Sequence, residues 1–148
     1  MKTEIVNGAL RINLVGISDK VEGQCFGEKG KELMDTMWSE IQDHGVRSYG
    51  LNHWVYLPDN QLFTGVELKE PSNDLGTLEL IEVVLPRFLR HVHVGPYSDL
   101  PKVWDKLLAQ VEHQGEIRVN PSVEIYGHWN EDPSRLETTI LIGLEEKG

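Results

Sequence analysis

The stretch from Ser122 to Trp129 carries the residues best able to do chemistry, a carboxylate with aromatic and imidazole neighbours. Side chains alternate between the two faces of a strand, so Glu124, Tyr126 and His128 are expected on one face. A carboxylate among aromatic rings attracts flat organic cations through its charge and through cation–π contact. Alternatively, a carboxyl group that is short of water can act as a general acid or base. The remaining interpretation is that Glu124 only faces solvent.

An earlier stretch of the chain matches this one in residue type. Trp54 and Tyr56 stand 70 positions before Glu124 and Tyr126. The match includes the preceding amphipathic helix, whose apolar positions coincide in the two copies, and the glycine that ends each helix. A repeat of this length indicates a duplicated supersecondary unit rather than a solenoid. Two such units would pair about a pseudo-dyad and leave a groove between them.

Periodicity places the elements of each copy. Apolar residues recur at helical spacing from Leu100 to Val111, and a first helix is expected over 31–44, closed by Gly45. A polar linker at 71–74 separates the halves. Strands are expected at 11–21, 53–57, 62–68, 78–85, 88–94, 123–129 and 135–144. The sequence therefore predicts an α+β fold of duplicated βαββ units, at about 10–70 and 78–146, in which an antiparallel sheet carries two helices on one face and a central ligand groove.

The two faces of the central strands differ in character. The aliphatic Val55, Val123 and Ile125 are expected to pack against the helices, because amphipathic helices bury apolar surface. The opposite face then carries Trp54, Tyr56, Glu124 and Tyr126, on one shared side of the sheet. The helix tryptophans Trp38 and Trp104 lie on apolar stripes and are expected in the core, although either could also border the groove.

Composition narrows the class of protein. With 148 residues the chain is expected to be a single domain, 1–148. Its formal net charge of −10 disfavours direct contact with nucleic acid, whose affinity rests on basic residues. No membrane-length apolar run or signal-peptide pattern is present. A single cysteine, Cys25, agrees with a reducing cytoplasm and is expected to be a half-buried apolar residue.

No cofactor or metal is predicted. The glycines at 23–30 lack the GxGxxG spacing of a dinucleotide site. His91 and His93 share a strand face and His128 could join them, but no cysteine or acidic residue at ligand spacing supports a metal. No GxSxG pattern suggests a nucleophilic serine.

Several stretches resemble the GyrI-like family, the effector-binding domain also found in multidrug-responsive regulators such as Rob and BmrR. The similarity covers residues 12–144. Its most specific pieces are the H-x-G-x-Y stretch of His93, Gly95 and Tyr97 and the glutamate-bearing strand. The matching stretches are LVGIS at 14–18, GVEL at 65–68, VVLP at 83–86, HVGPYSDLPKVWDKLLAQV at 93–111 and PSVEIYGHW at 121–129.

The resemblance implies a site. In that family the acidic residue of the late strand lies in a central groove and contacts cationic drugs, and the matching residue here is Glu124. Tyr126 stands beside it, and Tyr97 is expected in the groove wall. Together with the strand and helix patterns, this gives a candidate ligand-binding set of Trp54, Tyr56, Tyr97, Trp104, Glu124, Tyr126 and His128.

The resemblance leaves the function open between three types. Only a short tail precedes residue 12, so a stand-alone member is expected. The first interpretation is a binder of small aromatic, cationic or electrophilic molecules. The second is a hydrolase of cyclopropane-bearing cytotoxins, in which Glu124 assists water and Tyr126 or His128 donates a hydrogen bond. The third is a protein-binding modulator such as a gyrase inhibitor. Haem, bound by the distantly related SOUL proteins, has no supporting motif here.

Overall fold

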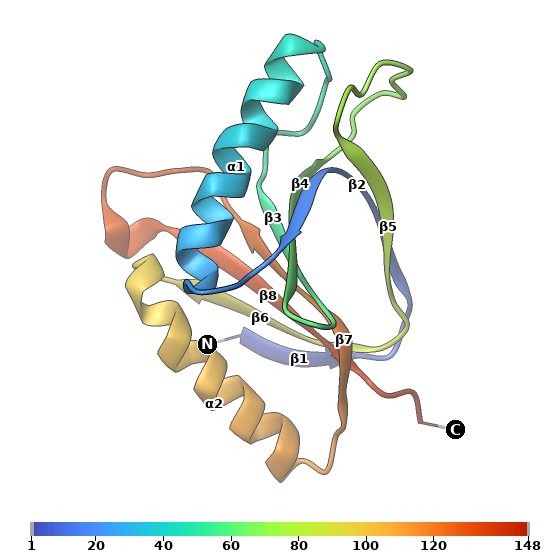
Figure 1. The fold of residues 1–148 in the computed structure, drawn as a ribbon. Helices are drawn as coiled ribbons and strands as arrows, with labels where there is room; N and C mark the ends of the chain where they lie inside the picture. The colour runs from blue at the N-terminus through green and yellow to red at the C-terminus, as the bar shows by residue number, and fades with distance from the viewer. Residues whose placement is uncertain (1, 148) are drawn as a thin grey trace.

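The computed structural model describes residues 2–147 and has the α+β architecture predicted from the sequence (Figure 1). Eight strands form one antiparallel sheet in the order β1-β6-β8-β7-β3-β4-β2-β5. The helices are α1 (Phe26–Asp43) and α2 (Leu100–His113), with short 3-10 turns η1 (Tyr97–Asp99) and η2 (Pro133–Arg135). The strands are β1 (Lys2–Val6), β2 (Leu10–Lys20), β3 (His53–Leu57), β4 (Gln61–Glu67), β5 (Glu79–Leu85), β6 (Phe88–Val94), β7 (Arg118–Tyr126) and β8 (Glu137–Leu144).

The duplicated βαββ unit is present. One copy is β2-α1-β3-β4 and the other is β6-α2-β7-β8, and the two join where β3 pairs with β7. Across this junction Trp54 pairs with Glu124, its own counterpart 70 residues later. A residue paired with its repeat equivalent lies at the pseudo-dyad. Trp54 and Glu124 therefore share one face at the centre of the sheet, as the alternation predicted.

Two boundaries differ from the prediction in ways that matter for the site. Helix α1 begins at Phe26, five residues earlier than expected, and contains Gly27 and Gly30 in its first turns. Strand β7 runs over 118–126 instead of 123–129. Strand β1, a short edge strand paired with β6, was not predicted, because a five-residue segment is too short for its alternation to stand out.

The prediction that Val55, Val123 and Ile125 pack against the helices is wrong. Val55 and Val123 are buried on the helix-free face, and Ile125 packs against the same cluster. The strands on either side supply the rest of that cluster: Ile12, Leu14, Phe63, Val83, Leu85, Phe88 and Leu141. The twisted sheet curves so that its own strands cover this face (Figure 1). The prediction fails because the apolar face of a strand can be buried by other strands of a curved sheet as well as by a helix.

Both helices lie on the other face of the sheet (Figure 1). Helix α1 packs Met37 and Ile41 against β2 and β4, and α2 packs Leu107 and Val111 against β8. Each helix thus covers the outer strands of its own repeat, and β3 and β7 are left between the two helices. Neither helix, within residues 2–147, combines the length and the apolar character that crossing a membrane requires.

Gly30 sets how closely α1 approaches the central strands. A Cβ atom at this position would overlap the Trp54 indole ring. We therefore expect Gly30→Ala to lower the free energy of unfolding by about 1–3 kcal/mol, the usual cost of overpacking, and to shift tryptophan emission. Gly27→Ala is the matched control, because a Cβ there meets only the Cys25 sulfur at 3.9 Å. Urea denaturation of the two variants checks this, and equal stability of both would contradict it.

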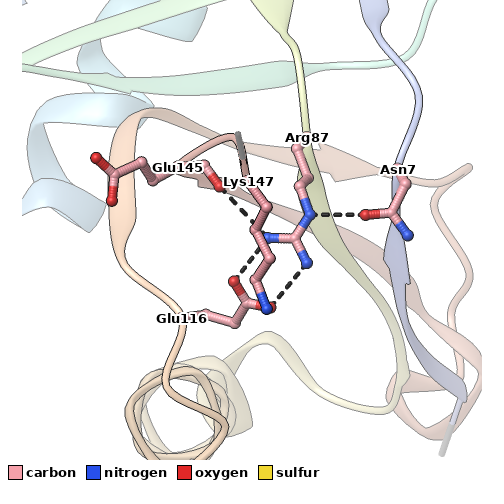
Figure 2. Close-up of polar contacts among 5 residues, drawn as sticks. All are labelled: Asn7, Arg87, Glu116, Glu145 and Lys147. Atoms are coloured by element: carbon pink, nitrogen blue, oxygen red, sulfur yellow. Dashed lines mark hydrogen bonds and ion pairs between the residues drawn. The ribbon is translucent and has the colours of Figure 1, made fainter.

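A buried ion pair between Arg87 and Glu116 connects the turn before β6 with the loop before β7 (Figure 2). Arg87, in the turn between β5 and β6, donates two hydrogen bonds to the Glu116 carboxylate, at 2.6 and 2.7 Å. The Arg87 Nε atom donates to Asn7 Oδ1 at 2.7 Å, and Lys147 Nζ lies 3.4 Å from Glu116 Oε2. The Arg87 and Glu116 side chains are only 10% and 5% exposed. This group of contacts, the Arg87 clamp, holds the loop that leads from α2 into β7.

Candidate functional site

A cavity of about 930 Å³ lies between α1 and α2, over the central strands β3 and β7. This volume is in the range of small-molecule sites. The first residues of both helices, Phe26 and Leu100, border it. Aromatic side chains dominate the wall: Phe26, Trp54, Tyr56, Tyr97, Trp104, Tyr126 and Trp129.

Glu124 lies at the floor of this cavity and is 2% exposed. Its Oε1 atom accepts hydrogen bonds from the hydroxyls of Tyr56 and, at 2.8 Å, of Tyr126. Its Oε2 atom accepts from the Trp104 indole N–H at 2.8 Å. Within residues 2–147 no basic side chain forms an ion pair with Glu124. The three donors hold the carboxylate from β3, β7 and α2, and no cation among the described residues pairs with it.

The two tyrosines are held as donors. Burial raises the pKa of the Tyr56 and Tyr126 hydroxyls well above the usual value, and the adjacent Glu124 charge raises both further. At neutral pH both hydroxyls keep their protons and donate to the carboxylate. The site therefore presents an anionic centre whose hydrogen-bond donors do not ionise.

Six of the aromatic rings form two groups of three, each held by edge-to-face contacts. On one side of Glu124, the Tyr56 ring centroid lies 5.5 Å from that of Phe26 and 5.8 Å from that of Trp104. On the other side, the Tyr126 ring centroid lies 5.3 Å from that of Trp54 and 5.4 Å from that of Tyr97. Such packing fixes the rings around the cavity before any ligand enters.

The structure brings together six of the seven residues proposed from the sequence: Trp54, Tyr56, Tyr97, Trp104, Glu124 and Tyr126 all line the cavity. His128 is exposed and does not line it. Strand β7 ends at Tyr126, and the Gly127 N–H already bonds the Glu137 carbonyl at 2.9 Å, so strand alternation no longer positions His128. Trp104 borders the cavity, whereas Trp38 packs in the α1 core and donates to Asn52 at 2.8 Å.

Among the lining residues that were not predicted from the sequence, Phe26, Arg118 and Trp129 matter most for the site. Phe26 lies in a glycine-flanked segment that resembles a loop, and Arg118 lies before the predicted start of its strand. Trp129 follows β7, is 74% exposed and stands at the rim. The aromatic type of Phe26 and Trp129 was a usable signal, but their distance from Glu124 depends on the path of the chain around them.

His91 and His93 share a strand face, as predicted, but neither lines the cavity. His91 is buried, its Nδ1 lies 2.6 Å from Thr3 Oγ1, and burial lowers its pKa. Among residues 2–147 no cluster of three or more histidine, cysteine or acidic side chains is placed to hold a metal ion.

Comparison with family models found no match, and comparison with curated proteins found none. Solved structures do match. The C-terminal domain of EcmrR superposes with a TM-score of 0.74 at 19% identity, covering 99% of this chain and 100% of that chain. In the EcmrR–DNA complex the match covers 58% of the EcmrR chain.

Two further structures share the fold. SAV2435 bound to tetraphenylphosphonium gives a TM-score of 0.68 at 14% identity, covering 98% of this chain and 94% of that one. A hydrolase from Listeria innocua gives 0.61 at 14% identity, covering 97% and 92%. The eight-stranded antiparallel sheet with two helices is thus the GyrI-like fold, as the sequence motifs predicted.

Proposed function

We propose that the protein binds small aromatic cations in the cavity around Glu124. The observation that carries this proposal is a buried carboxylate, held by three donors in an aromatic cavity, with which no basic side chain of residues 2–147 forms an ion pair. Burying an unpaired charge is costly, and a cationic ligand would offset that cost. The surrounding rings add cation–π attraction. The phosphonium cation bound to SAV2435, which has the same fold, supports this ligand class.

The net charge and the free cysteine of the chain support a small-molecule partner and a cytoplasmic location. The formal net charge of −10 attracts cations and opposes nucleic acid, so we propose that the chain does not itself contact DNA. Cys25 is exposed, not half-buried as expected, and it is unpaired. A free thiol persists in a reducing compartment, which supports a cytoplasmic location.

A hydrolase is the second candidate, with Glu124 and Tyr126 as its catalytic residues. Glu124 Oε1 already accepts two hydrogen bonds, but Oε2 accepts only one and could orient a water molecule. A hydrolase from Listeria innocua has the same fold, which supports this second candidate. We rank binding first because the three donors occupy most of the acceptor positions that water activation would use.

Titration with tetraphenylphosphonium tests the proposal. Trp54, Trp104 and Trp129 border the cavity, so we expect saturable quenching of tryptophan fluorescence. Triphenylphosphine oxide, aromatic but uncharged, is the control, and we expect it to bind at least about tenfold more weakly because it cannot offset the Glu124 charge. Equal binding of the two compounds, or no saturable response to the phosphonium, would contradict the proposal.

A further inference from the structure

We infer that the cavity contains a second subsite, at Arg118, which takes a carboxylate, so that the preferred ligand is an aromatic cation bearing an acidic group. This inference rests on the proposed function and defines its ligand more narrowly. It assigns the two ends of one ligand to two protein charges, Glu124 and Arg118. Both residues line the same cavity.

Trp104 stands between these two charges. Its indole N–H donates to Glu124 Oε2 at 2.8 Å, while the Arg118 guanidinium carbon lies 5.4 Å from the centroid of its ring. One tryptophan thus contacts the anion through its edge and the cation through its face. The arrangement holds the two charges apart, and no direct ion pair forms between Glu124 and Arg118.

Arg118 differs from the other arginines of the chain in lacking an acidic partner. Within residues 2–147 no carboxylate lies within 4.0 Å of its guanidinium nitrogens, although the chain has 24 acidic residues. Each of the other arginines makes such a contact: Arg11, Arg47, Arg87, Arg90 and Arg135. Glu124 and Arg118 are thus opposite charges that line one cavity without an ion pair among residues 2–147, together with the exposed Lys31 and Asp105. A zwitterion with its cation at Glu124 and its anion at Arg118 would complement these two charges.

The guanidinium keeps donors available for a ligand. Among residues 2–147 its one side-chain hydrogen bond is from Nη2 to Ser122 Oγ at 3.3 Å, and contact with the Trp104 ring consumes no N–H group. Partial burial lowers the pKa of Arg118, so the charged form loses hydration without gaining an anionic partner. A ligand carboxylate can compensate for the lost hydration through two parallel charge-assisted hydrogen bonds to the guanidinium. The contacts with Trp104 and Ser122 hold the group in place for this.

A matched pair of phosphonium ions tests the inference. Butyltriphenylphosphonium and (4-carboxybutyl)triphenylphosphonium share the same aromatic cation and differ by a terminal carboxylate. We expect the carboxylated ion to bind about tenfold more tightly to the wild-type protein, the gain of one charge-assisted contact at a partly exposed site. The measured quantity is the ratio of the two dissociation constants, obtained by calorimetry.

Variants assign the preference to Arg118. In Arg118→Met the ratio should fall to about one, and in Arg118→Lys it should be intermediate, because lysine keeps the charge but not the planar fork. Lys31→Met removes the other basic side chain of the cavity wall and should keep the wild-type ratio. If Arg118→Met does not fold, as judged by thermal denaturation, Arg118→Gln takes its place.

The outcomes separate the inference from the proposed function. A wild-type ratio of one, or a preference that persists in Arg118→Met, overturns the carboxylate subsite while binding of the butyl compound stands. A preference that is lost in Lys31→Met but kept in Arg118→Met would mean that Lys31 binds the carboxylate, which also overturns the inference. If neither phosphonium binds, the proposed function fails and the inference falls with it.

Discussion

Replacing Glu124 with glutamine is expected to weaken tetraphenylphosphonium binding by about 2–3 kcal/mol, roughly 30- to 150-fold. The substitution keeps the size of the side chain and removes its charge. Because Glu124 is 2% exposed and surrounded by rings, its attraction for a cation is poorly screened by water. Affinity for triphenylphosphine oxide should change little. Equal losses for the charged and the neutral compound would mean that Glu124 maintains the shape of the cavity and does not recognise charge.

The glutamine variant needs one structural control. The amide oxygen can replace Oε1 as acceptor for Tyr56 and Tyr126, but the amide NH₂ would then meet the Trp104 N–H, a second donor. Trp104→Phe removes that donor. The double variant Glu124→Gln/Trp104→Phe is therefore compared with Trp104→Phe alone, a pair that differs in charge without the donor conflict. A similar loss of phosphonium affinity in this pair assigns the effect to the carboxylate.

Local periodicity was enough to predict most of the fold. The helical spacing from Leu100 to Val111 reproduces α2 closely, because that stripe packs on one sheet face and nothing interrupts it. The 70-residue offset holds through the helix and the following strand, and it predicted that Trp54 and Glu124 are related. It does not hold beyond this point, since three residues separate β3 from β4 and ten separate β7 from β8.

The face of the central strands that meets the helices could not be predicted from alternation. Alternation shows that Val123 and Glu124 point to opposite sides, but the side that the helices cover depends on the curvature of the whole sheet. The start of α1 at Phe26 could not be predicted from the local sequence either. Gly27 and Gly30 disfavour a helix locally, and the close approach of Trp54 to Gly30 is a tertiary contact that overrides this preference.

Breaking the Arg87 clamp is expected to cause the largest loss of stability of any single change considered. In Arg87→Met the Glu116 carboxylate loses both charge-assisted hydrogen bonds while its side chain stays buried. The double variant Arg87→Met/Glu116→Leu should recover much of the loss, because no buried charge is then left alone. Glu82→Gln breaks the exposed pair with Arg11 and serves as control, with little expected change. Thermal denaturation midpoints at pH 7 give the comparison, and a double variant less stable than Arg87→Met would contradict it.

The clamp also predicts how stability depends on pH. The hydrogen bonds from Arg87, with help from Lys147, lower the pKa of Glu116 to about 2 from its usual value of 4.5. A carboxyl whose pKa is lower in the folded state stabilises the fold fully above pH 4.5, and that contribution is lost as the pH falls towards 2. In Glu116→Gln this part of the pH dependence should disappear, so that the wild-type and variant denaturation midpoints converge between pH 4.5 and 2. Parallel curves over that interval would show that the ion pair does not set the charge state of Glu116.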